Sequence, residues 1–143
     1  MNIYEFHELL EKIPSVLNED EKEEKIIQIV DLMHFITCYN ADMKIIDCSN
    51  GKINTVEYQN QKIGILFFEL KKFTEPLPLY ETFYDICHTT KSKTEELWFV
   101  FVEENSTSNF RQFIDFIEEH KLSSLFDKIF LFQFFQSVIN QLK

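Results

Sequence analysis

The segment from Met43 to Phe73, MKIIDCSNGKINTVEYQNQKIGILFFELKKF, constrains the fold more than any other part of the chain. Asn50-Gly51 is typical of a two-residue hairpin turn, because a type I′ turn needs a positive φ at both central residues. Asn60-Gln61 is a weaker candidate for a second turn. With both turns in place, the segment predicts three antiparallel strands at 43–49, 52–59 and 62–71.

The two turns also predict which side chains share a face of the sheet. They place Asp47 opposite Asn54 and Asn54 opposite Phe67, and residues two apart along a strand lie on the same face. The residues predicted to share that face are Asp47, Asn54, Glu69 and Lys71. A carboxylate and a lysine at the end of so apolar a strand need an explanation, because an unpaired buried charge is costly.

A meander that ends in Glu-x-Lys, with an acidic residue upstream, resembles the restriction-endonuclease-like, or PD-(D/E)XK, nuclease superfamily. The resemblance implies an α/β (α+β) fold, in which a mixed sheet starts with the meander and carries helices on both faces. It also implies hydrolysis of phosphodiester bonds in DNA or RNA. Glu69 matches the metal-binding Glu of the family, and Lys71 matches the Lys that positions or activates the attacking water. Hard oxygen ligands of this kind suit Mg²⁺ or Mn²⁺.

The acidic partner of Glu69 departs from the family pattern. Family members place an Asp on the second strand, where this chain offers Asn54 and Glu57 but no Asp. Asp47 lies on the first strand instead, on the predicted face. Three alternatives stay open: Asp47 substitutes as the metal ligand, Glu57 does so after a register change, or the site is degenerate. An ordinary ion pair between Glu69 and Lys71 explains a motif this short equally well.

The charge of the chain argues against a nucleic-acid enzyme. The net charge is −10 with a single Arg, whereas nucleic-acid binding depends on Lys and Arg to neutralise phosphates. Residues 1–43 hold ten acidic and three basic residues, and residues 74–143 hold eleven and six. Residues 44–73 hold three acidic and five basic residues, so the predicted meander is the one positive part of the chain.

The composition predicts one cytoplasmic domain spanning 1–143. A chain of this length can bury a single core, and 45% apolar residues exclude a disordered chain. No apolar run reaches the ~18–20 residues of a membrane span. The three cysteines, Cys38, Cys48 and Cys87, lack metal-ligand spacing and fit reduced, buried thiols.

Helices and further strands surround the meander. Ile26, Val30, Met33 and Thr37 form the predicted inward stripe of a helix at about 20–39, with Asn18 or Asp20 as its cap. Leu97–Val102 is apolar on both faces and predicts a central strand beside the meander. The remaining predictions are helices at 3–13, 79–89 and 108–121, a strand at 128–133 and a closing helix at 134–143, unless 123–143 is one helix.

Two functions follow from these observations. The first is a metal-dependent nuclease or nuclease-like protein, with Asp47 and Glu69 (or Glu57) as metal ligands and Lys71 beside the water. Small domains of that family act as homodimers or rely on a partner. The second is a non-enzymatic acidic binding protein, such as an immunity protein or antitoxin, or a degenerate nuclease fold. Its carboxylates would block a basic partner by electrostatic complementarity.

Overall fold

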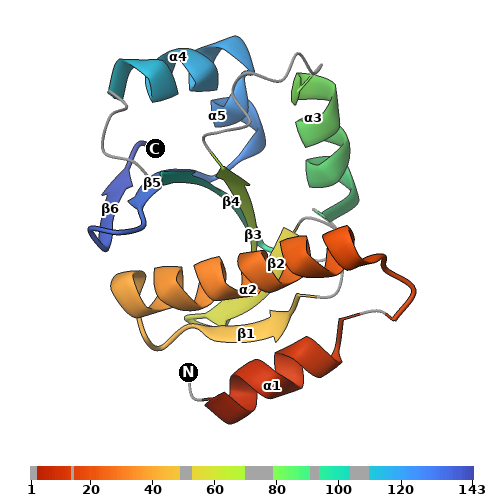
Figure 1. The fold of residues 1–143 in the computed structure, drawn as a ribbon. Coiled ribbons are helices and arrows are strands. Elements are labelled where there is room, and N and C mark those ends of the chain that lie inside the picture. The colour runs from red at the N-terminus through yellow and green to blue at the C-terminus, as the bar shows by residue number, and fades with distance from the viewer. Residues whose placement is uncertain (1–2, 14, 49–52, 70–78, 91–93, 104–109) are drawn as a thin grey trace.

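The computed structural model describes residues 3–13, 15–48, 53–69, 79–90, 94–103 and 110–143. A six-stranded mixed sheet carries helices on both faces, which confirms the predicted α+β class (Figure 1). The elements are α1 (Ile3–Glu11), α2 (Glu19–Tyr39), β1 (Lys44–Asp47), β2 (Ile53–Tyr58), β3 (Gln61–Glu69), α3 (Leu79–Thr90), β4 (Glu96–Glu103), α4 (Phe110–Glu119), α5 (Leu122–Leu125), β5 (Lys128–Gln133) and β6 (Val138–Gln141).

The strands lie in the sheet in the order in which they occur in the chain, from β1 to β6. β1, β2 and β3 are antiparallel, β4 and β5 follow parallel to β3, and β6 is antiparallel to β5. The predicted meander and the predicted place of β4 beside it are confirmed, although the turn at Asn50-Gly51 lies outside the described residues.

The turn between β2 and β3 lies one residue earlier than predicted. Tyr58 pairs with Gln61, and Gln59 and Asn60 between them have φ values of 52° and 63°. Both central residues are therefore left-handed, as a type I′ hairpin requires, and Gln59 accepts a conformation that is uncommon for its residue type. The shift moves the partner of Asn54 from Phe67 to Ile65.

An irregularity in β1 changes the second predicted register. Ile45 faces Val56 as predicted, but the pairing shifts between Ile45 and Asp47, so that Asp47 faces Thr55. Such a bulge inserts one extra residue into a strand and re-aims the side chains beyond it. Asp47 is half-buried, and the following Cys48 packs into the core beneath α2.

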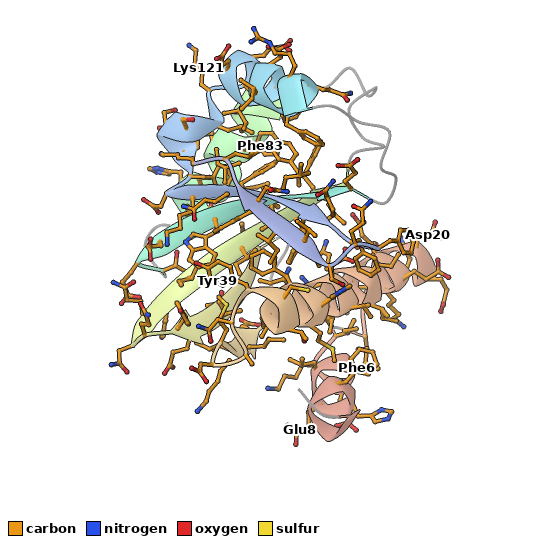
Figure 2. All side chains as sticks on the ribbon, turned by 90° about the vertical axis from the view of Figure 1, so that its left-hand side faces the viewer. Phe6, Glu8, Asp20, Tyr39, Phe83 and Lys121 are labelled. Atoms are coloured by element: carbon orange, nitrogen blue, oxygen red, sulfur yellow. The ribbon has the colours of Figure 1, made fainter. Side chains whose placement is uncertain are left out.

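Two hydrophobic cores lie on the two faces of the sheet. Phe35 of α2 and Val100 of β4 belong to the core on the side of α1 and α2, and Phe113 of α4 and Phe99 of β4 belong to the other. Figure 2 shows the same division, with Tyr39 at the end of α2 on one side and Phe83 of α3 on the other. β4 is buried on both faces, as expected for a parallel strand between two helical layers.

α2 turns a different stripe towards the sheet than the one predicted. It begins at a capping box in which the Asn18 side chain accepts a hydrogen bond of 2.9 Å from the Glu21 amide. Its buried residues are Lys25, Ile29, Asp31, Leu32, Phe35 and Ile36, while Ile26, Val30 and Thr37 of the predicted stripe are exposed. The helix is therefore rotated, and the rotation buries two charged residues. None of the helices in the described part of the chain has the length and apolar character that a membrane span needs.

The predicted closing helix at 134–143 is wrong, and so is the alternative of one helix over 123–143. The chain turns back through Ser137, with φ 53°, and adds β6 to the outer side of β5. Ile139 packs into the core beneath α2, whereas Leu142 packs against the opposite core. Ile139 and Leu142 are three residues apart and would lie on one face of a helix, but in an extended chain they point to opposite faces of the sheet.

Candidate functional site

Asp47 and Glu69 are too far apart to bind one metal ion. Asp47 pairs with Thr55, and Thr55 pairs with Gly64 in β3. Glu69 lies five residues further along β3, which corresponds to roughly 16 Å at the rise of a strand. Oxygen ligands of Mg²⁺ lie about 2 Å from the ion and hence within about 4 Å of one another. The predicted pair of ligands does not come together.

Glu57 does not replace Asp47 either. It is exposed, and it pairs with Lys44 on one side and Lys62 on the other, seven residues from Glu69 along β3. Glu69 is the last residue of β3, and Lys71 lies outside the described residues. In the part of the chain that the structure describes, no group of three or more His, Cys, Asp or Glu side chains is placed to hold a metal ion. The register thus separates Glu57 from Glu69, as it separates Asp47 from Glu69.

A polar cluster does lie between α2 and the first two strands, and its central member is Lys25. This side chain is only 5% exposed, and its Nζ donates a hydrogen bond of 3.3 Å to Oε1 of Gln28. Burial lowers the pKa of Lys25, while the Cys48 sulfur in its ionised form and the Asp47 carboxylate act in the opposite direction. Burial likewise raises the pKa of Cys48 to about 11, so the thiol is protonated and unreactive at neutral pH.

Asn54 is the second unusual polar residue on this side of the sheet. It is fully buried on β2, between Ile65 across the strands and Val56 along its own strand. Neither its amide nitrogen nor its amide oxygen has a hydrogen-bond partner among the residues described. Such a group costs free energy, because it has left water without compensation. Asn54 occupies the strand that carries an Asp in the resembling family, but it lies four residues short of Glu69 in register.

α2 runs from the carboxyl ends of the parallel strands towards their amino ends. The ring of Phe35 lies 5.8 Å from that of Phe132 near the end of β5, and the ring of Tyr39 lies 5.3 Å from that of Trp98 near the start of β4. Asp31, one turn before Phe35, is buried at 7% exposure and lies towards the carboxyl ends. Lys25 and Asp31 were missed from the sequence because the apolar stripe was assigned to the wrong side of α2.

Replacing Lys25 by Met should stabilise the protein by about 1 kcal/mol at neutral pH, because the folded wild type pays a free-energy cost for burying the charge of Lys25 and the variant does not. The pKa of Lys25 in the folded state is lower than 10.5, its value in the unfolded chain. Between these two pKa values the unfolded chain therefore binds more protons than the folded protein, and stability increases as the pH rises. The wild type then gains stability, and the advantage of Lys25→Met shrinks. Urea denaturation between neutral pH and about pH 10 measures the difference, with Lys22→Met as the matched control on the same helix. A Lys25→Met protein that is less stable at every pH would show that attraction to Asp47 outweighs burial.

The arrangement of the sheet and helices is similar to that of a solved protein. An fdxN element excision controlling factor protein from Anabaena variabilis superposes with a TM-score of 0.53 and 14% sequence identity, over 82% of this chain and 98% of that chain. An XisH family protein from Nostoc punctiforme gives a TM-score of 0.42 and 15% identity, over 78% and 98%. No protein-family model and no curated protein sequence matches the chain. Identities this low concern the fold alone.

Proposed function

We propose that this chain is a non-enzymatic acidic binding protein built on a nuclease-like fold. The observation that carries the proposal is the register of the meander, which separates Asp47 from Glu69 by five positions. The positions of β3 that lie level with Asp47 and just beyond it are Gly64, Ile65 and Leu66, none of which can bind a metal or activate water. The register of the described strands thus does not bring together Asp47, Glu57 and Glu69, the carboxylates predicted as ligands.

The surface supplies the binding chemistry of this proposal. The start of α2 exposes Glu19, Asp20, Glu23 and Glu24, in a chain whose net charge is −10. Helix capping needs only Glu21 from this segment, and the favourable effect of acids on the helix dipole is confined to the first turn. The further carboxylates suit a partner with a basic surface, since complementary charge speeds association and selects the partner.

The name of the fold neighbour is compatible with this function. It is described as a factor that controls excision of an element, which is a controlling role. An immunity protein or antitoxin also controls the activity of another protein, by binding to it. The proposed function is a controlling role in this general sense.

Charge reversal on α2 tests the proposal. The Glu23→Lys/Glu24→Lys variant should bind the basic partner at least about tenfold more weakly, because each reversal turns an attraction into a repulsion. The matched control is Glu118→Lys/Glu119→Lys, which makes the same change at two exposed residues of α4. The partner is obtained by capture on the immobilised wild-type chain, and its affinity is then measured by calorimetry at low and high salt. Binding that ignores both salt and the reversal on α2 would contradict the proposal.

A metal-dependent nuclease is the second candidate, favoured by the strand order and by the Glu69-x-Lys71 motif at the end of β3. In this reading Asp31 would take the place of Asp47 as the second carboxylate. The same purified protein decides between the two: we expect no cleavage of DNA or RNA with Mg²⁺ or Mn²⁺. Cleavage that Lys71→Ala and Glu69→Ala abolish, but Asp47→Asn leaves unchanged, would favour the nuclease.

A further inference from the structure

The two edges of the sheet differ in how they are protected against pairing with another chain. β1 carries an irregularity between Ile45 and Asp47 and two charged residues, Lys44 and Asp47. Bulges and charges are the usual devices that prevent an edge strand from pairing with another. β6, with the sequence VINQ, has no charge, no proline and a regular register with β5. Among the described strands, it pairs with β5 alone.

Apolar side chains are exposed beside this open edge. Phe135, at the tip of the β5–β6 hairpin, is 76% exposed, and Val138 at the start of β6 is 42% exposed. The hairpin is nevertheless held firmly, because the ring of His34 in α2 contacts Ser137 at 3.0 Å and packs 4.6 Å from the ring of Phe134. An edge that is already ordered loses little entropy when it pairs.

The charge distribution indicates what pairs with it. Residues 128–143 contain two lysines and no acidic residue, in a chain whose net charge is −10. Because the chain is strongly negative, two copies repel each other when their acidic surfaces meet. Contact through β6 brings together residues 128–143, which have no acidic side chain, so this repulsion is smallest there. The edge is also self-complementary, since an antiparallel pair of identical strands is related by a two-fold axis.

We propose that two copies of this chain associate through β6, which pairs antiparallel with β6 of the second copy, so that one sheet continues across both. This inference does not depend on the proposed function, because it uses neither the acidic surface of α2 nor the Glu69-x-Lys71 motif. The paired strands have four residues each, so the interface is small and the dimer should dissociate on dilution.

Charge substitution at the two exposed positions of β6, Val138 and Gln141, tests the pairing. The variants are Val138→Lys/Gln141→Lys and Val138→Glu/Gln141→Glu, followed by sedimentation equilibrium from micromolar to millimolar concentration. The wild type should reach twice the mass of the chain, and each variant should dissociate at least about tenfold more readily, because like charges of the two copies are then brought together at one edge of the sheet. An equimolar mixture of the two variants should recover the dimer. Ile46→Lys, at an exposed position of β1, should leave the mass unchanged.

Three outcomes would overturn the inference. A wild type that is monomeric at every concentration would mean that the edge of β6 receives another kind of chain or none. A dimer that persists in both charged variants would place the contact elsewhere. Variants that dissociate but do not recombine when mixed would show that the substitutions act through the fold, which circular dichroism of each variant checks separately.

Discussion

Asn54→Asp should destabilise the protein by about 3 kcal/mol at neutral pH, whereas Asn54→Leu should be as stable as the wild type or more so. The two introduced side chains have the same number of non-hydrogen atoms, both are branched at Cγ, and they differ in polarity. Asp would place a charge where the amide already has no hydrogen-bond partner among the described residues, and leucine would remove both unsatisfied atoms. The comparison therefore shows whether this buried position accepts a neutral amide but not a charged carboxylate.

The pH dependence of Asn54→Asp follows from the same argument. Burial without partners raises the pKa of the introduced carboxyl above its unfolded value of about 3.9, so its cost is present at neutral pH and disappears as the unfolded chain also binds the proton. Urea denaturation at neutral pH and near pH 4 measures the change. Mn²⁺ should not restore stability, because Ile65, the partner of Asn54 on β3, offers no second ligand. A variant that Mn²⁺ stabilises strongly would contradict the non-enzymatic proposal, and one as stable as the wild type at neutral pH would show that water reaches this position.

Phe35→Ala should cost about 3–5 kcal/mol, the range for removing a fully buried aromatic ring. Phe35 is 0% exposed, and its ring lies within 6.0 Å of the ring centres of Tyr39, Phe67, Phe130 and Phe132. Tyr39 belongs to α2 itself, and the other neighbours belong to β3 and β5, so the cavity would loosen the attachment of the helix to two strands at once.

The matched control for this experiment is Phe135→Ala, which removes the same atoms from an exposed position and should change stability by less than about 0.5 kcal/mol. The Phe135 measurement is made at low protein concentration, so that association through β6 does not contribute. Fluorescence of Trp98 reports on the same region, because its ring contacts Tyr39 on the next turn of α2. Equal losses in the two variants would mean that α2 does not rest on Phe35.

The sequence predicted the order of elements as far as β5, with the exception of the short helix α5, which was not predicted. The three strands of the meander, β4, β5 and α3 lie within two residues of their predicted bounds, because their apolar runs and turn residues are local signals. α2 was predicted with the correct bounds but the wrong face. Its apolar residues are frequent enough to support two stripes, and only packing against the sheet selects the one that contains Phe35.

The candidate site was harder to predict because it depends on register. A turn displaced by one residue at Gln59-Asn60 and a bulge between Ile45 and Asp47 together separated residues that an ideal meander brings together. Neither feature has a sequence signal that is independent of its neighbours. β6 was missed for a related reason, since four residues are too few to separate a helical from an alternating pattern.

The coincidence of strand order and chain order has a consequence for how the protein is made. Each strand pairs with the one before it, so during synthesis every newly emerged segment meets a neighbour that has already left the ribosome. The sheet can then grow by adding one strand at a time to the same edge, without a strand having to wait for a distant part of the chain. The chain segment between two pairing strands stays short, so the entropy lost in closing it is small. Of the six described strands, β6 is added after all the others, and it is this strand that carries the uncharged edge.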